Sequence, residues 1–262
     1  MPERNRNIQI AVLGQDRRQT AAAQALRAAG CRVGGAEAVP AADFILLPVP
    51  LPWDAAWAAL LQKAKPGALL LGGRAPAEAA GLGRRWVNCY AREALAVRNA
   101  VPTAEGCLSI LLARRTRTLW GAPVLVAGYG RVGQAVAVRL TALGAKVTAA
   151  ARSPAQRALA EALGAAVVPL TELAAAAAGF DTVVNTIPAP VLTAPVLAAL
   201  RPGSLIVDLA SAPGGTDFAA AAALEHTALL APGLPARCAP DSAGEYLAET
   251  VLEIIREGEA AG

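Results

Sequence analysis

Val124-Leu-Val-Ala-Gly128-Tyr-Gly130-Arg-Val-Gly133-Gln-Ala-Val-Ala137 is the stretch that decides the fold of the second half of this chain. Four apolar residues run directly into a complete GxGxxG pattern, which an amphipathic helix should follow. In such a loop the first glycine permits a tight turn, the second lets a pyrophosphate approach the backbone, and the third lets the helix pack on the strand. The phosphates then lie at the positive end of that helix. The cofactor-binding residues predicted here are Gly128, Tyr129, Gly130, Arg131, Val132 and Gly133.

The residues after the next expected strand, Lys146 to Ala151, indicate which dinucleotide is bound. An NAD site usually has an acidic residue about twenty positions after the glycines, where it bonds the ribose 2′-hydroxyl. No acidic residue occurs between Tyr129 and Ala160, and Arg152 and Ser153 stand at the strand end instead. A guanidinium and a hydroxyl suit a 2′-phosphate, so we predict NADP. The alternative is that Arg152 is an ordinary solvated arginine.

Length and composition narrow the class of protein. A chain of 262 residues suggests two domains of ordinary size. The longest uncharged run, Thr182 to Leu200, contains three prolines, which argues against a membrane-spanning helix. The N-terminus lacks the apolar core of a signal peptide, so we expect a cytoplasmic protein.

Charge and cysteine spacing exclude two further classes of site. The net charge of +4 is spread along the chain with few aromatic residues nearby, which does not favour nucleic-acid binding. The four cysteines have no CxxC spacing and His226 is the only histidine, so we expect buried thiols and no metal site. We interpret His226 as structural because it falls near a helix end.

Strands and helices alternate along the chain, which predicts an α/β protein of two doubly wound parallel-sheet domains. Residues 1–102 should form an N-terminal substrate or partner domain, and residues 103–262 a Rossmann NADP-binding domain; alternatively, residues 241–258 pack back on the first domain. A long connecting helix is expected from Thr103 to Thr118, after Pro102. Ligands of open parallel sheets lie at the carboxyl ends of strands. We therefore expect the Asp208 to Ser211 segment to face the nicotinamide and substrate, and assign cofactor positioning to Asn185, Thr186, Ile187 and Pro188.

Several segments together resemble the A subunit family of bacterial dipicolinate synthases, in the same order along nearly the whole chain. Besides the glycine loop they are Asn99-Ala-Val-Pro-Thr-Ala-Glu-Gly106, Asn185-Thr-Ile-Pro-Ala189, Asp208-Leu-Ala-Ser211, Pro213-Gly-Gly-Thr-Asp-Phe218 and Leu230-Ala-Pro-Gly-Leu-Pro235. The chain departs from the family pattern at Gln15, where a second glycine is expected, and at Ala236 and Arg237, where glycine and lysine are expected.

This resemblance implies an oxidoreductase that forms dipicolinate by NADP-dependent dehydrogenation of dihydrodipicolinate or its hydroxy-tetrahydro precursor. It also implies a dicarboxylate substrate, the flavoprotein-like B subunit of dipicolinate synthase as partner, and action in the mother cell of a sporulating bacterium. We further expect a homo-oligomer.

Specific residues are candidates for the chemistry of that reaction. Guanidinium groups and hydroxyls suit carboxylates, so we expect substrate binding by Arg17, Thr103, Ser211 and Arg237. Glu105 is the first candidate for general base, because burial near the domain junction would raise its proton affinity. Asp208 is the second candidate, although a bond to Ser211 would make it structural. Thr103 is equally well placed to cap a helix that begins after Pro102.

Two other functions remain open at this stage. One is a sibling dehydrogenase of the shikimate, hydroxyacid or alanine type, which the absence of an evident catalytic lysine or histidine near a strand end disfavours. The other is a non-catalytic, NADP-sensing protein. Reduction of a keto acid by the chain alone would favour the first, and loss of turnover with retained NADP binding after removal of Glu105 or Arg17 would speak against the second.

Overall fold

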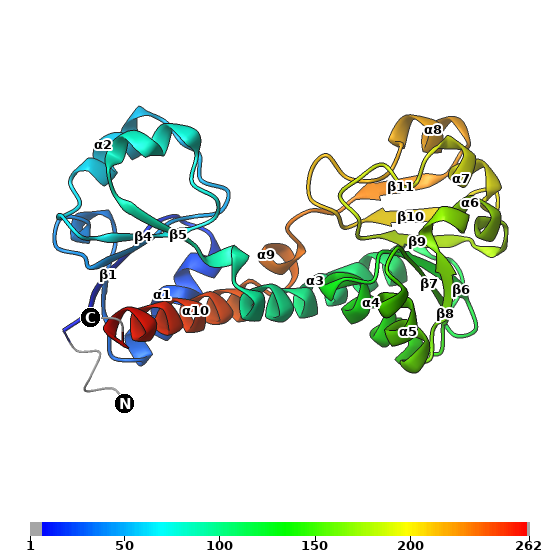
Figure 1. Cartoon of the computed structure of the whole chain (residues 1–262), viewed down its shortest axis with the longest axis horizontal. Coiled ribbons are helices and arrows are strands. Elements are labelled where there is room, and N and C mark those ends of the chain that lie inside the picture. Colours follow the sequence, from blue (N-terminus) through cyan, green and yellow to red (C-terminus); the bar gives the residue numbers. More distant parts are fainter. Residues whose placement is uncertain (1–6, 261–262) are drawn as a thin grey trace. The chain divides into compact units, whose positions relative to one another are not determined.

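The computed structural model describes residues 7–260, with side chains described to residue 258. The chain divides into two compact units. Unit 1 comprises Met1–Asn99 together with Ala239–Gly262, and unit 2 comprises Ala100–Cys238. Each unit contains one parallel sheet with helices on its faces (Figure 1). The α/β class with two doubly wound parallel sheets is therefore confirmed.

The sheet of unit 1 has five parallel strands in the order β2-β1-β3-β4-β5. Their bounds are Gln9–Val12 (β1), Arg32–Gly34 (β2), Phe44–Leu46 (β3), Leu69–Gly72 (β4) and Arg85–Asn88 (β5). This order reverses direction between β1 and β3, which puts a topological switch point at their carboxyl ends. Strand β2 was not expected from the sequence, because Arg-Val-Gly is short and has no apolar run.

The α-helices whose described residues lie wholly in unit 1 are Arg17–Ala28 (α1), Ala55–Gln62 (α2) and Pro240–Ala260 (α10). Short 3-10 turns lie at Ala36–Ala38 (η1), Ala77–Leu82 (η2) and Cys89–Ala91 (η3). The C-terminal helix α10 runs along α1 (Figure 1). A Cβ on Gly244 would lie 2.6 Å from the Cβ of Ala21, so the glycine lets the two helix backbones approach closely. Leu247, Val251 and Ile254 of α10 then complete the core beneath β1.

Helix α3, Glu93–Arg114, differs from the helix expected at Thr103 to Thr118. It begins ten residues earlier than predicted and includes Pro102 in its interior. The prediction was wrong because it treated proline as a residue that precedes helices, whereas Pro102 is buried inside this one. An interior proline removes one backbone hydrogen bond and crowds the carbonyl four residues before it, a cost that the packing of α3 must offset. Thr103 is therefore in mid-helix, and its predicted alternative role as an N-cap is excluded.

The sheet of unit 2 has six parallel strands in the order β11-β10-β9-β6-β7-β8. Their bounds are Pro123–Ala127 (β6), Lys146–Ala151 (β7), Ala166–Pro169 (β8), Thr182–Asn185 (β9), Leu205–Asp208 (β10) and Thr227–Leu230 (β11). Read from β8, this is the strand order of a Rossmann dinucleotide fold, with its switch point between β6 and β9. The pairing of Ala127 with Asn185 brings the glycine loop beside the turn that follows β9.

Alternate residues of each strand in unit 2 face two different helix layers. Val124 and Val126 pack with α3 and α4 (Arg131–Ala142), whereas Leu125 and Ala127 pack under α6 (Leu173–Ala176) and α7 (Ala194–Ala199). The remaining elements of the unit are α5 (Pro154–Ala162), α8 (Phe218–Ala223), α9 (Leu234–Cys238) and the 3-10 turns η4 (Leu170–Glu172) and η5 (Ala177–Gly179). Helices on both faces leave the carboxyl edge of the sheet as the place for a ligand.

Candidate functional site

The glycine loop lies between β6 and α4 at the switch point of the unit 2 sheet. Gly128 has φ +95°, and a Cβ there would overlap the hydroxyl of Thr186. A Cβ on Gly133 would overlap the carbonyl oxygen of Gly128, so α4 can pack on β6 only with glycine at this position. Gly130 differs from both, because a Cβ there would meet nothing within 4 Å. Its open side is where a pyrophosphate would lie against the backbone.

The first turn of α4 suits an anion. Gly130 is its N-cap and no acidic residue occupies the first turn, so the helix presents its first backbone N–H groups and the positive end of its dipole. Arg131 is exposed beside these groups, Val132 is half-buried and the Tyr129 side chain is buried in the core. Tyr129 can therefore contribute only its backbone to a cofactor.

The strand-end turn Asn185 to Pro188 is held by a buried polar network. The Asn185 amide Nδ2 donates to the carbonyl of Ile187 at 3.1 Å and to Asp208 Oδ1 at 3.0 Å, while its Oδ1 accepts from the Ile187 N–H. The Thr186 hydroxyl donates to the Ala127 carbonyl at 3.0 Å. Because Asn185 is fully buried, it positions the turn rather than projecting toward a ligand.

Asp208, at the end of β10, is the centre of this network. Its Oδ1 accepts from Asn185 and the Ala210 N–H at 3.0 Å, and its Oδ2 accepts from the Gly215 N–H at 2.9 Å and the Thr216 hydroxyl at 2.6 Å. The carboxylate is fully buried, and its four hydrogen bonds satisfy both oxygens, as burial of a charged group requires. The hydroxyl that bonds it belongs to Thr216 and not to Ser211, which is exposed. Sequence reasoning missed Thr216, although it lies inside the PGGTDF segment.

Two arginines lie at the end of β7, where an adenosine ribose would lie in this fold. Arg152 is exposed, and its side chain has no hydrogen bond or ion pair within residues 7–258. Arg157, from the first turns of α5, donates through Nη1 to the carbonyls of Ala151 and Arg152, both at 2.9 Å. Ser153 is the N-cap of α5. Sequence reasoning missed Arg157; the signal was its place one turn after Pro154, from which a side chain reaches back to the strand end.

Three of the predicted catalytic or substrate residues belong to α3 and α9, two helices that pack on each other. A Cβ on Gly106 would come within 2.6 Å of the Cys238 sulfur and 3.1 Å of Leu234, so α9 rests directly on α3 at this glycine. Thr103 and Glu105 precede Gly106 on α3 and, being two positions apart, lie on different sides of that helix, whereas Arg237 belongs to α9. Arg237 is exposed, with no side-chain partner in the described part of the chain.

Glu105 does not have the surroundings that were expected. Its side chain is 56% exposed and Oε1 lies 3.7 Å from Arg139 Nη2 on α4. The expectation of a buried carboxyl is thus wrong for the described structure, because α3 turns this residue outward beside a cation. Its role as general base stays a prediction.

Arg17, predicted as a carboxylate clamp in unit 1, is paired with another residue of that unit. Its Nη2 and Nε bond the two carboxylate oxygens of Asp241 on α10, at 2.6 and 3.2 Å. Both side chains are well exposed, so the pair exchanges readily with solvent.

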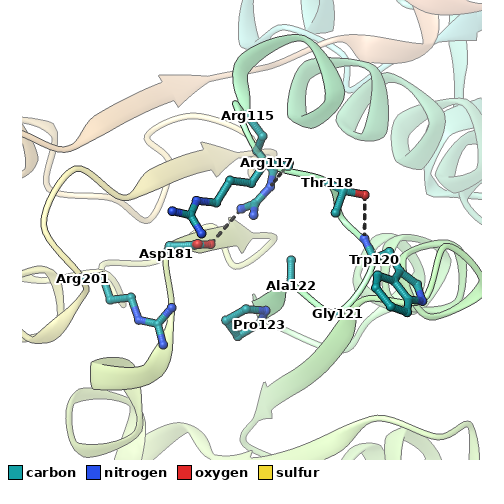
Figure 2. Close-up of a pocket in the computed structure, with 9 residues that line it drawn as sticks. All are labelled: Arg115, Arg117, Thr118, Trp120, Gly121, Ala122, Pro123, Asp181 and Arg201. Carbon is teal, nitrogen blue, oxygen red and sulfur yellow. Dashed lines mark hydrogen bonds and ion pairs between the residues drawn. The ribbon is translucent and has the colours of Figure 1, made fainter.

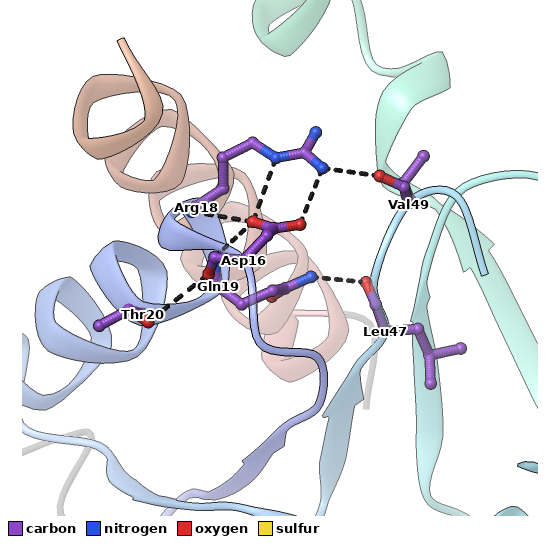
Figure 3. Close-up of polar contacts among 6 residues, drawn as sticks. All are labelled: Asp16, Arg18, Gln19, Thr20, Leu47 and Val49. Carbon is purple, nitrogen blue, oxygen red and sulfur yellow. Dashed lines mark hydrogen bonds and ion pairs between the residues drawn. The ribbon is translucent and has the colours of Figure 1, made fainter. Parts of the chain in front are cut away.

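The next residue, Arg18, is the more firmly held guanidinium of unit 1. It joins the Asp16 carboxylate to the carbonyl of Val49, as Figure 3 shows. Burial alone would raise the pKa of Asp16, but the hydrogen bond and charge of Arg18 outweigh it and lower the pKa.

The remaining polar candidates have structural surroundings. His226 accepts the Ser204 N–H through Nδ1 at 3.2 Å, and its Nε2 lies 2.9 Å from the Leu197 carbonyl.

Cys31, Cys89 and Cys107 are buried, whereas Cys238 is exposed, contrary to the expectation of four buried thiols. Within the described residues, no group of three His, Cys, Asp or Glu side chains is arranged to hold a metal ion. No helix in the same residues is long and apolar enough to span a membrane.

Comparison with known proteins agrees with this geometry. Residues 93–234 match the family model for the D-isomer specific 2-hydroxyacid dehydrogenase NAD binding domain. The A subunit of dipicolinate synthase from Bacillus subtilis is 39% identical over 177 residues, which are 68% of this chain and 60% of that relative.

Two solved structures of dipicolinate synthase A subunits match almost the entire chain. The dipicolinate synthase A subunit of Bacillus subtilis has a TM-score of 0.86 at 30% identity and covers 97% of this chain and 98% of its own. The A subunit from Bacillus halodurans has a TM-score of 0.86 at 29% identity and covers 94% and 97%. By sequence and by structure, this chain belongs to the A subunit family of dipicolinate synthases, and its residues 93–234 form an NAD binding domain of the D-isomer specific 2-hydroxyacid dehydrogenase type.

Proposed function

We propose that this chain is an NADP-dependent oxidoreductase that forms dipicolinate by dehydrogenating dihydrodipicolinate or its hydroxy-tetrahydro precursor. The observation that supports a dehydrogenase most directly is the glycine loop at the switch point, with Gly128 and Gly133 packed against backbone and side chains and Gly130 open. The substrate follows from the names of the relatives that match nearly the full length of the chain.

NADP is favoured over NAD by the charges at the end of β7. A 2′-phosphate carries two negative charges, and planar guanidinium groups bind its oxygens through charge-assisted hydrogen bonds. Arg157 is held at the strand end by the two carbonyls that it bonds, which leaves Arg152 beside it to close on the phosphate. An acidic residue that would repel the phosphate is absent from the chain between Glu105 and Glu161.

Dehydrogenation of a dihydropyridine requires a hydride acceptor and a route for one proton. The nicotinamide supplies the acceptor when it is bound. Among this chain's residues, Glu105 remains the proposed proton acceptor, while Thr103 and Arg237 remain candidates for holding a substrate carboxylate. Ser211 and Arg17 remain further candidates for substrate carboxylates. If the hydroxy-tetrahydro form is the substrate, loss of water comes before hydride transfer.

Asp208 is better suited to positioning than to proton transfer. Four donors already occupy its two oxygens, and no part of its side chain reaches solvent. We therefore assign it the role of holding the turns after β9 and β10 against each other. The proposal also includes the flavoprotein-like B subunit of dipicolinate synthase as partner and a homo-oligomeric assembly.

A coupled assay tests the reaction. The product of dihydrodipicolinate synthase is offered to the purified chain with NADP or NAD, with and without the candidate B subunit, while dipicolinate and reduced cofactor are followed by ultraviolet absorbance. We expect equal amounts of dipicolinate and NADPH. Measurable NADPH binding with no product under any combination would contradict the substrate assignment and favour a sensing role.

Substitution of the two arginines tests the cofactor assignment separately. In Arg152→Gln with Arg157→Gln, we expect NADPH affinity to fall by about tenfold or more, because charge-assisted bonds are lost, while NADH affinity stays within about twofold. Arg256→Gln is the matched control, since Arg256 is exposed on α10 and its side chain has no partner among residues 7–258. An equal loss for both cofactors would overturn the NADP assignment.

A further inference from the structure

The opposite edge of the unit 2 sheet contains a second concentration of arginines, away from the glycine loop. It lies where α3 ends and where β6, β9 and β10 begin, so it is at the amino ends of the strands. Two adjoining hollows of about 410 and 290 Å³ share Arg115, Arg117 and Asp181. Arg201 and Trp120 line the first hollow, and Arg114 lines the second. We call this region the arginine pocket (Figure 2).

Arg115 is the structural member of the arginine pocket. Its side chain is only 7% exposed, and Nη1 bonds Asp181 Oδ1 at 2.8 Å and also the Thr182 hydroxyl. Its Nε reaches the carbonyl of Arg117 at 3.4 Å, which helps to hold the turn after α3. The one carboxylate that lines the pocket is thus already paired with a buried guanidinium.

The positive charges of the other arginines are not paired with an acidic side chain in this way. Arg114, Arg117 and Arg201 are exposed, and within the part of the chain that the structure describes their side chains have no hydrogen bond or ion pair. No acidic residue occurs between Glu105 and Glu161, or between Asp181 and Asp208, so the segments that bear these arginines contain no acidic residue besides Asp181. Like charges gathered around one hollow repel one another, and a bound anion removes that repulsion.

The backbone around the pocket is held in place before any ligand arrives. The Gly121 N–H donates to the Gly144 carbonyl at 2.7 Å, and the Arg201 N–H donates to the Phe180 carbonyl at 3.0 Å. The Trp120 ring lies against Gly144, where a Cβ would come within 2.5 Å of its Cδ1, and it is 77% exposed. Fixed anchors reduce the entropy lost when a ligand is bound.

We propose that the arginine pocket binds a small multivalent anion, with phosphate or carboxylate oxygens bridging Arg117 and Arg201. Guanidinium forks match both kinds of oxygen pair, and the two residues come from different loops, so one ligand would join the turn before β6 to the loop after α7. This site is separate from the dinucleotide loop and does not depend on the proposed reaction.

Calorimetric titration tests the proposal with two probes at constant ionic strength: inorganic pyrophosphate for phosphate esters and citrate for carboxylates. In Arg117→Gln with Arg201→Gln, we expect the affinity for the bound probe to fall by about tenfold or more. Arg256→Gln should bind as the unsubstituted chain does, and circular dichroism should show that each variant is folded. Whichever probe binds identifies the class of anion.

Binding at the glycine loop gives a different result from binding at the arginine pocket. Pyrophosphate held only by the glycine loop would bind the double variant as tightly as the original chain, and that result would overturn the proposal. Failure of both probes to bind the original chain would overturn it as well. Loss of binding in the double variant, with NADPH affinity unchanged, would support it.

Discussion

Asp208→Asn tests whether the buried carboxylate holds the cofactor-facing turns. The asparagine retains one oxygen, and its amide must replace either Oδ1 or Oδ2. If the amide NH2 takes the place of Oδ2, the Thr216 hydroxyl can rotate and accept a hydrogen bond from it. The Gly215 N–H, however, then faces this NH2, which is also a donor. A buried N–H left without an acceptor costs about 1–3 kcal/mol, and the remaining bonds lose the reinforcement of the charge.

Relief of the desolvation of a buried charge offsets part of that loss, so we expect the free energy of unfolding to fall by about 3 kcal/mol. Thr216→Val removes one donor and leaves three, for which about 1 kcal/mol is expected. Asp217→Asn is the matched control, because Asp217 is exposed and caps α8 through the Ala220 N–H at 2.9 Å. Asparagine caps a helix as well as aspartate, so the control should change by less than about 0.5 kcal/mol.

Urea denaturation followed by circular dichroism measures all three variants. Dinucleotide affinity is the second measurement, because Asp208 anchors Asn185 and so the turn beside Gly128. We expect Asp208→Asn to weaken binding and Asp217→Asn to leave it unchanged. An Asp208→Asn variant as stable as Asp217→Asn, with the same affinity, would refute the positioning role.

Three other predictions concern the glycine loop, the thiols and Asp16. Gly130→Ala should leave the unfolding midpoint unchanged, because a Cβ at this position meets nothing within 4 Å, yet it should abolish dinucleotide binding. Gly133→Ala should lower both the unfolding midpoint and the dinucleotide affinity. If the two variants changed the unfolding midpoint equally, that result would count against the loop geometry. A thiol reagent at pH 8 should modify Cys238 first in the folded chain, because burial raises the pKa of Cys107 to about 12 and closes it to solvent; rapid modification of several thiols would disprove this. Because the pKa of Asp16 is lowered in the folded state, the stability that its carboxylate contributes is present above the ordinary pKa of 3.8 and is lost as pH falls through the folded value. In urea titrations, Asp16→Asn should therefore be less stable than the original chain at neutral pH and as stable as the original chain at low pH. A stability difference independent of pH would contradict this prediction.

Local patterns were sufficient for much of the fold. The alternation of apolar strands and helices predicted both parallel sheets, because each strand needs only its own run of buried residues to be recognised. The elements that failed were those whose local signal conflicts with their packing. β2 has one apolar residue in three, and α3 continues through Pro102 with buried core residues on both sides of it, Leu95 before and Ala104 after.

The sequence by itself determined the dinucleotide loop, since the spacing of Gly128, Gly130 and Gly133 follows from the geometry of one strand, one turn and one helix. Only the tertiary structure decided which side chains meet. Asp208 bonds Asn185 at the end of β9 and Thr216 in the loop after β10, and Arg17 bonds Asp241 near the other end of the chain. Such partners are brought together by the order of strands in a sheet and by the packing of helices. The spacing of residues along the sequence does not predict either of these.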